Sequence, residues 1–235
     1  MACDGSFVRF LEDITSSDAR LDVTPRRSDP SVRPAYRRLG VEDERDARLF
    51  VPRSALGLDR IPLLVWLHGA GGGERDDPGR FAEPAQRRGF AVLLPASRER
   101  TWDLMMDGYG PDVAVIERSL EATWRRIPVD VGRLAIGGFS DGASYALSLG
   151  LTNGDLFTHV IAASPGFVGP VEPHGRPDIF LSHGTEDGVL PIDQTSRDIV
   201  PQLRGDGYAV RFVVFDGPHA VPPEVARTAV RWFLE

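Results

Sequence analysis

The sequence predicts an α/β protein: a mostly parallel central sheet with helices on both faces and an antiparallel hairpin at one edge. After Pro62, short and almost wholly apolar runs alternate with amphipathic segments, which is typical of buried parallel strands with crossover helices. Between residues 35 and 52, apolar and polar residues partly alternate, which is typical of half-exposed strands. The chain has 235 residues, so we expect one domain over 1–235, with 1–34 as an extension.

The segment 35–52 predicts two strands that form a hairpin at the sheet edge. Its stretches YRRLGV and ARLFVP alternate in polarity, and acidic turn residues separate them. Upstream, residues 7–14 are a candidate short helix, and the charged, proline-broken stretch 25–34 is a predicted loop.

The repeated units after Pro62 predict the parallel strands and their helices. Asp77 is expected to cap the first helix, with Pro78 at its first helical position and Gly89 at its end. The predicted strands are 63–67, 90–94, 134–138, 159–163, 179–182 and 210–215, and the predicted helices are 78–88, 112–126, 141–151, 192–206 and 223–234. Ligands of such sheets bind beyond the carboxyl ends of the strands, so residues there are the site candidates.

Composition excludes several classes of function. The net charge is -7, which argues against nucleic acid and anionic membranes as partners. All 27 basic residues are arginine, so Ser-Lys catalysis, Schiff-base chemistry and a Walker lysine are excluded. The single cysteine, Cys3, can form neither an internal disulfide nor a multi-cysteine zinc site.

No targeting or membrane segment is evident in the sequence. The N-terminus is acidic where a secretory signal is basic, and the apolar run 61–67 is too short to span a bilayer. We expect a cytoplasmic protein without a transmembrane segment. The sequence does not specify an oligomeric state.

The stretch AIGGFSDGASYAL places Ser140 between Gly138 and Gly142, after an apolar run and before a helical one. One interpretation is structural, with the glycines in a loop and the serine as a helix cap. The other is that G-x-S-x-G between a strand and a helix presents the serine hydroxyl as a nucleophile.

A nucleophilic serine needs a base and a group that orients the base. Asp187 follows the predicted strand 179–182, and His219 follows the predicted strand 210–215, so the order along the chain is Ser140, Asp187, His219. Asp187 has a structural alternative as a turn cap before Pro191.

Other acids and histidines compete for these roles. Glu186 and Asp193 are neighbouring acids, although Asp193 falls at the start of a predicted helix, where it would favour the helix dipole. Two histidines, His68 and His183, precede glycines at strand ends and are expected to orient loops. No catalytic context surrounds His159 or His174.

The glycine run 69–73 predicts an oxyanion hole, because glycines let backbone N–H groups approach a developing negative charge. As a phosphate loop it fails, since G-x-G-x-x-G would need glycine at Glu74 and a Walker motif needs lysine. The expected donors are the N–H groups of Ala70 and Asp141, with that of Gly71 as a further candidate.

In order, HGAGGG, GFSDGAS, HGTEDGVLP and DGPHAVP resemble the motifs of the α/β-hydrolase superfamily, over residues 36–235. Within it the chain is similar to the phospholipase/carboxylesterase branch and to polyhydroxybutyrate depolymerase-like and feruloyl esterases. The acyl-protein thioesterase relatives usually have glutamine after the serine, where this chain has Asp141. They also have an acidic residue after their oxyanion glycines, where this chain has Gly72 and Gly73. Ser140 differs from the cysteine nucleophile of dienelactone hydrolases.

The resemblance implies a serine hydrolase that cleaves small or medium carboxylic esters without a cofactor or metal. Since 164–177 is too short for the inserted cap domain of many relatives, we expect an open site. Its predicted lining is Trp102, Met105, Met106 and Phe167, for which core packing is the alternative. A thioesterase, a peptidase or a non-catalytic ligand-binding relative are the alternative functions.

Overall fold

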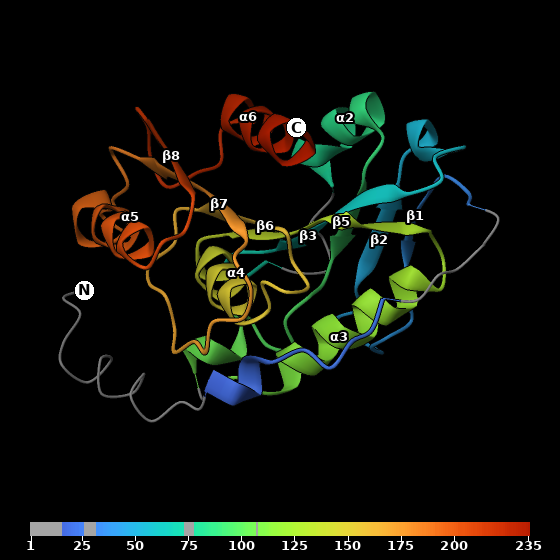
Figure 1. Ribbon diagram of the computed structural model, residues 1–235, viewed down its shortest axis with the longest axis horizontal. Helices are drawn as coiled ribbons and strands as arrows, with labels where there is room; N and C mark the ends of the chain where they lie inside the picture. The colour runs from blue at the N-terminus through green and yellow to red at the C-terminus, as the bar shows by residue number, and fades with distance from the viewer. Residues whose placement is uncertain (1–15, 26–31, 73–77, 107) are drawn as a thin grey trace.

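The computed structural model describes residues 16–25, 32–72, 78–106 and 108–235. Figure 1 shows one central sheet, whose eight strands follow the order β1-β2-β4-β3-β5-β6-β7-β8. The strands are β1 (Ala35–Arg38), β2 (Arg48–Val51), β3 (Ile61–Leu67), β4 (Ala91–Leu94), β5 (Val129–Phe139), β6 (His159–Ala163), β7 (Asp178–Gly184) and β8 (Val210–Phe215). From β4 to β8 along this order, neighbouring strands are parallel.

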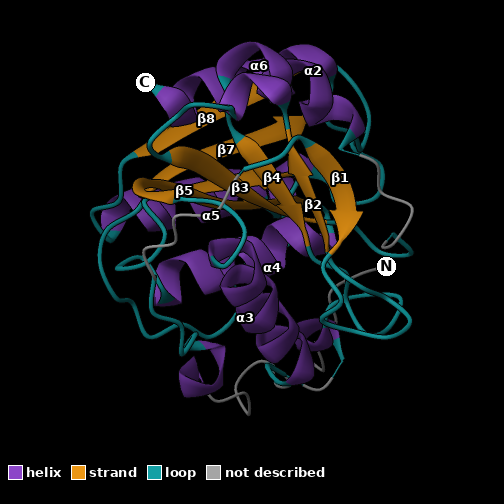
Figure 2. Cartoon of the chain, turned by 90° about the vertical axis from the view of Figure 1, so that its right-hand side faces the viewer, coloured by secondary structure: helices purple, strands orange, loops and turns teal. Residues whose placement is uncertain are grey.

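Helices cover both faces of the sheet (Figure 2). Helices α2 and α6 pack on one face, and α3, α4 and α5 pack on the other. Their bounds are α2 (Gly79–Arg88), α3 (Pro111–Trp124), α4 (Asp141–Thr152), α5 (Ser196–Gly205) and α6 (Pro223–Leu234), and short 3-10 turns are η1 (Ser16–Ala19), η2 (Arg53–Ala55), η3 (Asp103–Met105) and η4 (Ile192–Gln194). None of the described helices is long and apolar enough to cross a membrane.

The predicted hairpin is confirmed at the edge of the sheet. Strand β2 runs antiparallel to β1 on one side and to β4 on the other. Leu49 and Val51 of β2 are buried while Arg48 and Phe50 are partly exposed, as expected for a half-exposed strand.

Strand β3 shows why the central strands are apolar throughout. All seven of its residues are buried. Leu63 and Val65 join the core beneath α3 and α4, whereas Leu64 and Trp66 join the core beneath α2 and α6. Successive side chains of a strand point to opposite faces, so a strand covered on both faces has no position for a polar residue.

Several boundaries differ from the prediction, and three of these differences bear on how the elements pair or end. Strand β5 begins at Val129 rather than at 134, because buried Val129 pairs with Ile61 and the strand continues through the exposed residues 131–133. The predicted helix 192–206 is interrupted at Thr195, whose backbone is not helical, and so divides into η4 and α5. Pro78 is the N-cap residue of α2 rather than its first helical residue, whereas Gly89 ends the helix in the left-handed region as predicted.

Two further predictions, the Asp77 cap and the short helix 7–14, fall on residues outside the described ranges.

Candidate active site

Three side chains from distant parts of the chain meet at the carboxyl edge of the sheet. His219 Nε2 lies 2.9 Å from Ser140 Oγ, and His219 Nδ1 lies 2.6 Å from Asp187 Oδ2. A carboxylate only accepts hydrogen bonds, so Nδ1 carries the proton and Nε2 accepts from the serine hydroxyl. The structure thus brings the predicted serine, acid and histidine into one hydrogen-bonded chain.

Ser140 occupies a strained turn between β5 and α4. Its φ of 57° and ψ of -123° lie in a region that residues with a Cβ rarely adopt. Its N–H donates to the Ala163 carbonyl at 3.0 Å, which continues the pairing of β5 with β6 by one residue. The side chain is held at the surface end of the strand, and the residue is 8% exposed.

The two glycines that flank this serine have a steric role. A Cβ on Gly138 would lie 2.2 Å from the Gly142 carbonyl oxygen, and a Cβ on Gly142 would lie 2.3 Å from the His68 carbonyl oxygen. Neither contact is possible without a backbone shift, because the opposing atoms are main chain. The G-x-S-x-G spacing therefore lets α4 pack closely against the ends of β3 and β5.

Asp187 is buried, and its carboxylate receives four donors. Oδ1 accepts from the N–H groups of Val189 (3.0 Å) and Leu190 (2.8 Å). Oδ2 accepts from His219 and also lies 3.1 Å from His183 Nε2. Burial by itself raises the pKa of Asp187, but the bonds from Leu190, His219 and Val189 together lower that pKa below its ordinary value.

His183 belongs to this cluster, although the sequence predicts for it only a role in orienting a loop. It is fully buried at the end of β7. Its other ring nitrogen, Nδ1, lies 2.6 Å from the hydroxyl oxygen of Ser196 at the start of α5. The i,i+4 spacing of His183 and Asp187 in HGTEDGVLP is the only trace of this contact in the sequence.

The glycine loop that begins at Gly69 runs directly beside the serine. A Cβ on Gly69 would lie 3.3 Å from Ser140 Cβ. The N–H of Gly71 donates to the Arg100 carbonyl at 2.6 Å, so the prediction of Gly71 as an oxyanion donor is wrong in this conformation. Ala70 and Asp141, at the N-terminus of α4, remain the candidates.

A second loop, residues 97–102, supports the glycine loop. Arg45 spans the two loops, because its Nε donates to the Ser97 carbonyl and its Nη2 to the Gly72 carbonyl, both at 2.6 Å. Trp102 Nε1 donates to the His68 carbonyl at 2.9 Å, and the Thr101 hydroxyl donates to the Asp141 carboxylate. The sequence did not point to Arg45, because its partners lie 27 and 52 residues away.

The predicted pocket residues have different environments. Trp102 is completely buried and stacks between His68 (4.9 Å between ring centroids) and Tyr145 (5.2 Å), so the core-packing alternative describes it and its predicted place in the pocket wall is wrong. Met106 is 53% exposed, Met105 is half-buried, and Phe167 is half-buried against the core. A contact of these three with substrate stays a prediction.

The competing acids and histidines lie elsewhere. Glu186 is exposed, and exposed Asp193 forms an ion pair with Arg197. His68 Nε2 accepts from the Ser97 N–H at 3.0 Å, so this histidine holds the two loops together as predicted. His159 packs against Trp232 and Phe233, far along β6 from the serine, and burial lowers its pKa.

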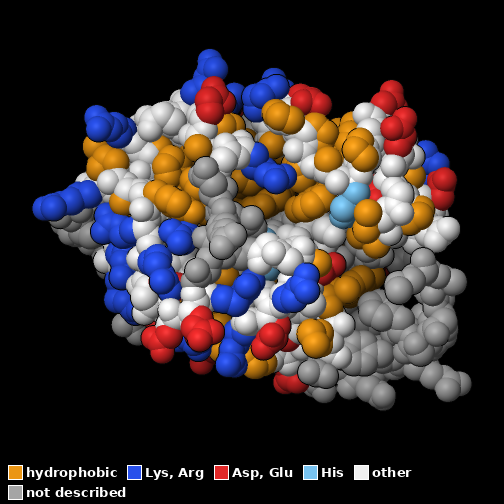
Figure 3. All heavy atoms as spheres, turned by 180° about the vertical axis from the view of Figure 1, so that it is seen from behind, with side chains coloured by type: hydrophobic (Ala, Val, Ile, Leu, Met, Phe, Trp, Pro, Cys, Tyr) orange, Lys and Arg blue, Asp and Glu red, His pale blue; other side chains and the backbone are white. Residues whose placement is uncertain are grey.

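No cap domain is inserted between β6 and β7. The segment 164–177 between β6 and β7 contains no helix, and it is held against α4 by Ser144 and Ser148, whose hydroxyls accept from the N–H groups of Gly166 and Gly169. Beside Asp187, Val189 is 66% exposed. Figure 3 shows hydrophobic side chains gathered over the upper half of one face, with histidine at the surface.

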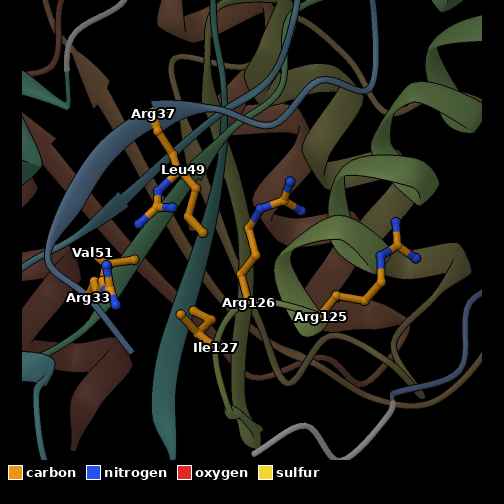
Figure 4. Close-up of a pocket in the computed structure, with 7 residues that line it drawn as sticks. All are labelled: Arg33, Arg37, Leu49, Val51, Arg125, Arg126 and Ile127. Carbon is orange, nitrogen blue, oxygen red and sulfur yellow. The ribbon is translucent and has the colours of Figure 1, made fainter. Parts of the chain in front are cut away.

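Two hollows rich in arginine lie away from this cluster. One of about 320 Å³ lies between the hairpin and the end of α3 (Figure 4), lined by Arg33, Arg37, Leu49, Val51, Arg125, Arg126 and Ile127. Another of about 270 Å³ lies between α2 and α6 and is again rich in arginine. Arginine recurs in both because every basic residue of the chain is arginine. Within the described ranges, no group of three or more His, Cys, Asp or Glu side chains is placed to hold a metal ion.

Comparison with known proteins found similar three-dimensional structures but no matching family model or curated sequence. Among solved structures, the chain is similar to esterase PE8, with a TM-score of 0.63 and 23% identity over 78% of this chain and 95% of that one. It is also similar to an S-formylglutathione hydrolase from Staphylococcus aureus, with a TM-score of 0.68 and 16% identity over 86% and 99% of the two chains.

A third similar structure is an acetyl xylan esterase from Aspergillus awamori, with a TM-score of 0.66 and 16% identity over 85% of this chain and 99% of that one. All three cover more than three quarters of this chain, despite low sequence identity. The protein therefore has the α/β-hydrolase fold, which the motifs of its sequence predicted.

Proposed function

We propose that the protein is a serine hydrolase that cleaves carboxylic esters through an acyl-enzyme on Ser140. The observation that carries the proposal is the continuous chain from Ser140 Oγ through His219 to Asp187, with bonds of 2.9 and 2.6 Å. A serine hydroxyl is a weak nucleophile by itself, and such an arrangement supplies the base and its orienting acid.

In the proposed reaction, Ser140 Oγ attacks the ester carbonyl carbon while His219 Nε2 takes the hydroxyl proton. The tetrahedral intermediate expels the alcohol, which takes that proton from His219. Water then attacks the acyl group, gives a proton to His219, and releases the acid as Ser140 regains its hydrogen. Asp187 orients the imidazole and stabilises its protonated form.

The negative charge of the intermediate requires donors, and the N–H groups of Ala70 and Asp141 are the proposed pair. Asp141 begins α4, where N–H groups have no partner within the helix and the dipole favours an anion. The path of the Gly69 backbone beside Ser140 supports Ala70 as the second donor. One such donor typically contributes about 100- to 1000-fold to turnover.

Small or medium carboxylic esters are the proposed substrates. Two of the similar structures are described as esterases and one as an S-formylglutathione hydrolase, which makes ester cleavage the leading reaction and thioester cleavage the alternative. The absence of a helix in the described segment 164–177 supports an open site that admits such substrates from solution.

The test is turnover of p-nitrophenyl esters of increasing acyl length, together with an acyl thioester and an aminoacyl p-nitroanilide. We expect turnover of the oxygen esters, rising with pH over the range in which histidine loses its proton. Preferential turnover of the thioester or the anilide would replace the ester assignment.

Covalent labelling identifies the nucleophile. A fluorophosphonate should label the wild type but not Ser140→Ala. The matched control is Ser164→Ala, because Ser164 is also buried, also has a positive φ (50°), and follows the neighbouring strand β6. Ser164→Ala should label normally. Equal labelling or turnover of Ser140→Ala and the wild type would contradict the proposal.

A further inference from the structure

We propose that His183 is a positioning residue, whose neutral imidazole holds the Asp187 carboxylate in the orientation that aligns His219. This inference rests on the proposed function. It concerns a second histidine on the same carboxylate oxygen: Asp187 Oδ2 lies 2.6 Å from His219 Nδ1 and 3.1 Å from His183 Nε2. The side chains of His183 and Asp187 are both fully buried.

The hydrogen-bond partners of His183 determine its tautomer. Its Nε2 faces two acceptors, the Asp187 carboxylate at 3.1 Å and the Leu190 carbonyl at 2.8 Å, so Nε2 carries the proton. Its Nδ1 faces the Ser196 hydroxyl at 2.6 Å and accepts from it. Ser196 therefore favours the tautomer in which His183 donates toward Asp187.

His183 donates as a neutral group. Burial is the main cause that lowers its pKa below the ordinary histidine value, against the opposing effects of Leu190 and Asp187. The ionisable groups that face it are Asp187 and His219. A neutral donor orients the carboxylate without cancelling the charge that His219 needs.

The same contacts close the turn that carries the acid. Leu190 donates its N–H to Asp187 Oδ1 and accepts at its carbonyl from His183 Nε2. Both ends of the turn 187–190 are thus tied to the end of β7, and neither carboxylate oxygen can rotate without breaking a bond. The turn has no regular secondary structure, so these side-chain bonds, together with the bond from the Glu186 N–H to the Gly217 carbonyl (2.9 Å), hold the acid near His219.

The test compares two variants at this position. His183→Phe keeps a planar ring but has no donor, whereas His183→Gln retains a side-chain N–H that can reach Asp187. For His183→Phe we expect a fall of about 10-fold in kcat, because a bond to a charged group is lost. The midpoint of the pH–rate profile should rise by up to about one pH unit, because a carboxylate with fewer donors pairs more strongly with a protonated imidazole.

His183→Gln should recover most of kcat and return the midpoint toward the wild-type value. His159→Phe is the matched control, a half-buried histidine that contacts Trp232 and Phe233 instead of the site. It should leave the midpoint unchanged whatever it does to stability. If His183→Phe does not fold, Ser196→Ala replaces it and should move the midpoint in the same direction by a smaller amount.

An unchanged midpoint in His183→Phe, or in Ser196→Ala where that variant replaces it, would overturn the inference, even if the yield of folded protein falls. So would a His183→Gln variant as impaired as His183→Phe. Failure of the proposed function gives a different result, because the wild type itself would then lack turnover and fluorophosphonate labelling.

Discussion

The acid of the proposed triad illustrates how single residues control this site. Asp187 is buried, yet it stays ionised because its two oxygens have donors from Val189, Leu190, His219 and His183. A depressed pKa means that the ionised carboxylate contributes to stability above the ordinary aspartate pKa and that this contribution is lost as the pH falls through the folded-state pKa. The site therefore keeps its acid charged in the neutral range.

Asp187→Asn should lower kcat by roughly 10⁴-fold, because the amide would donate toward His219 and favour the wrong tautomer. Turnover of a p-nitrophenyl ester and a urea titration measure activity and folding in parallel. The control is Asp193→Asn, which removes an exposed acid of the same region that forms an ion pair with Arg197. Asp193→Asn should retain wild-type activity, and loss of activity there instead would reassign the acid.

Arg45 is a second residue whose effect on catalysis we predict. Arg45→Gln should lower kcat by about 10-fold, because the two loops that flank the proposed oxyanion site lose the bonds to the Ser97 and Gly72 carbonyls. Arg126→Gln is the matched control, since Arg126 also donates to two carbonyls, those of Leu39 and Ala122, which belong to neither of these loops. It should affect only the urea midpoint. Equal kcat for Arg45→Gln and wild type would remove Arg45 from this role.

At the scale of elements, the site depends on the contact of α4 with the ends of β3 and β5. Gly138 and Gly142 occupy positions where any side chain would collide with main-chain atoms. Small residues continue along α4, where a Cβ on Gly150 would lie 2.4 Å from Val160 of β6. The turn that holds Ser140 is therefore stabilised by the packing of a whole helix rather than by local propensity.

Gly142→Ala should destabilise the protein by about 3 kcal/mol or more, because a Cβ there would lie 2.3 Å from the His68 carbonyl oxygen. Urea unfolding measures the change. Gly205→Ala, at the end of α5, has no atom within 4 Å of the new Cβ and should be neutral or stabilise by up to about 1 kcal/mol. A Gly142→Ala variant as stable as wild type would show that the helix can move at no cost.

At the scale of the whole molecule, a pair of acids, buried Asp112 and half-buried Asp103, connects the loop after β4 with α3 and α4. The backbone N–H of Asp103 donates to Asp112 (2.9 Å), the N–H of Asp112 donates to Asp103 (2.8 Å), and the Tyr145 hydroxyl donates to Asp103 (2.7 Å). Burial, and then the charge of Asp103, raise the pKa of Asp112 to about 6. This pair lies next to Trp102, which supports the loop beside the serine.

The raised pKa makes stability depend on pH. Between the unfolded value, near 3.8, and the folded value, about 6, the folded state binds more protons, so the contribution of Asp112 to stability falls as pH rises through this range. The total change is at most about 3 kcal/mol. Urea unfolding of wild type and Asp112→Asn from pH 4 to 7 measures the difference, which should shift in favour of the variant as pH rises. If the difference in unfolding free energy between the two proteins did not change with pH, this prediction would be wrong.

Much of this protein was determined by local sequence. Apolar runs bounded by turn residues specify buried strands wherever they occur, and the predicted strands and layers accordingly match β3 to β8. The order Ser140, Asp187, His219 could be predicted because residues that follow parallel strands must meet at one edge of the sheet. The role of Gly138 and Gly142 could also be predicted from the sequence, because the turn between β5 and α4 is formed by neighbouring residues.

Only the tertiary structure decided how the polar groups are paired. The Gly71 N–H donates to the Arg100 carbonyl. The Trp102 ring lies between His68 and Tyr145. The Ser196 hydroxyl orients His183 toward Asp187. Hydrogen bonds act over about 3 Å, while these partners are brought together by the packing of separate strands and loops. A pattern of residue types determines which side chains face the core or the site edge, but the direction of each bond depends on the final positions of neighbours distant in the chain.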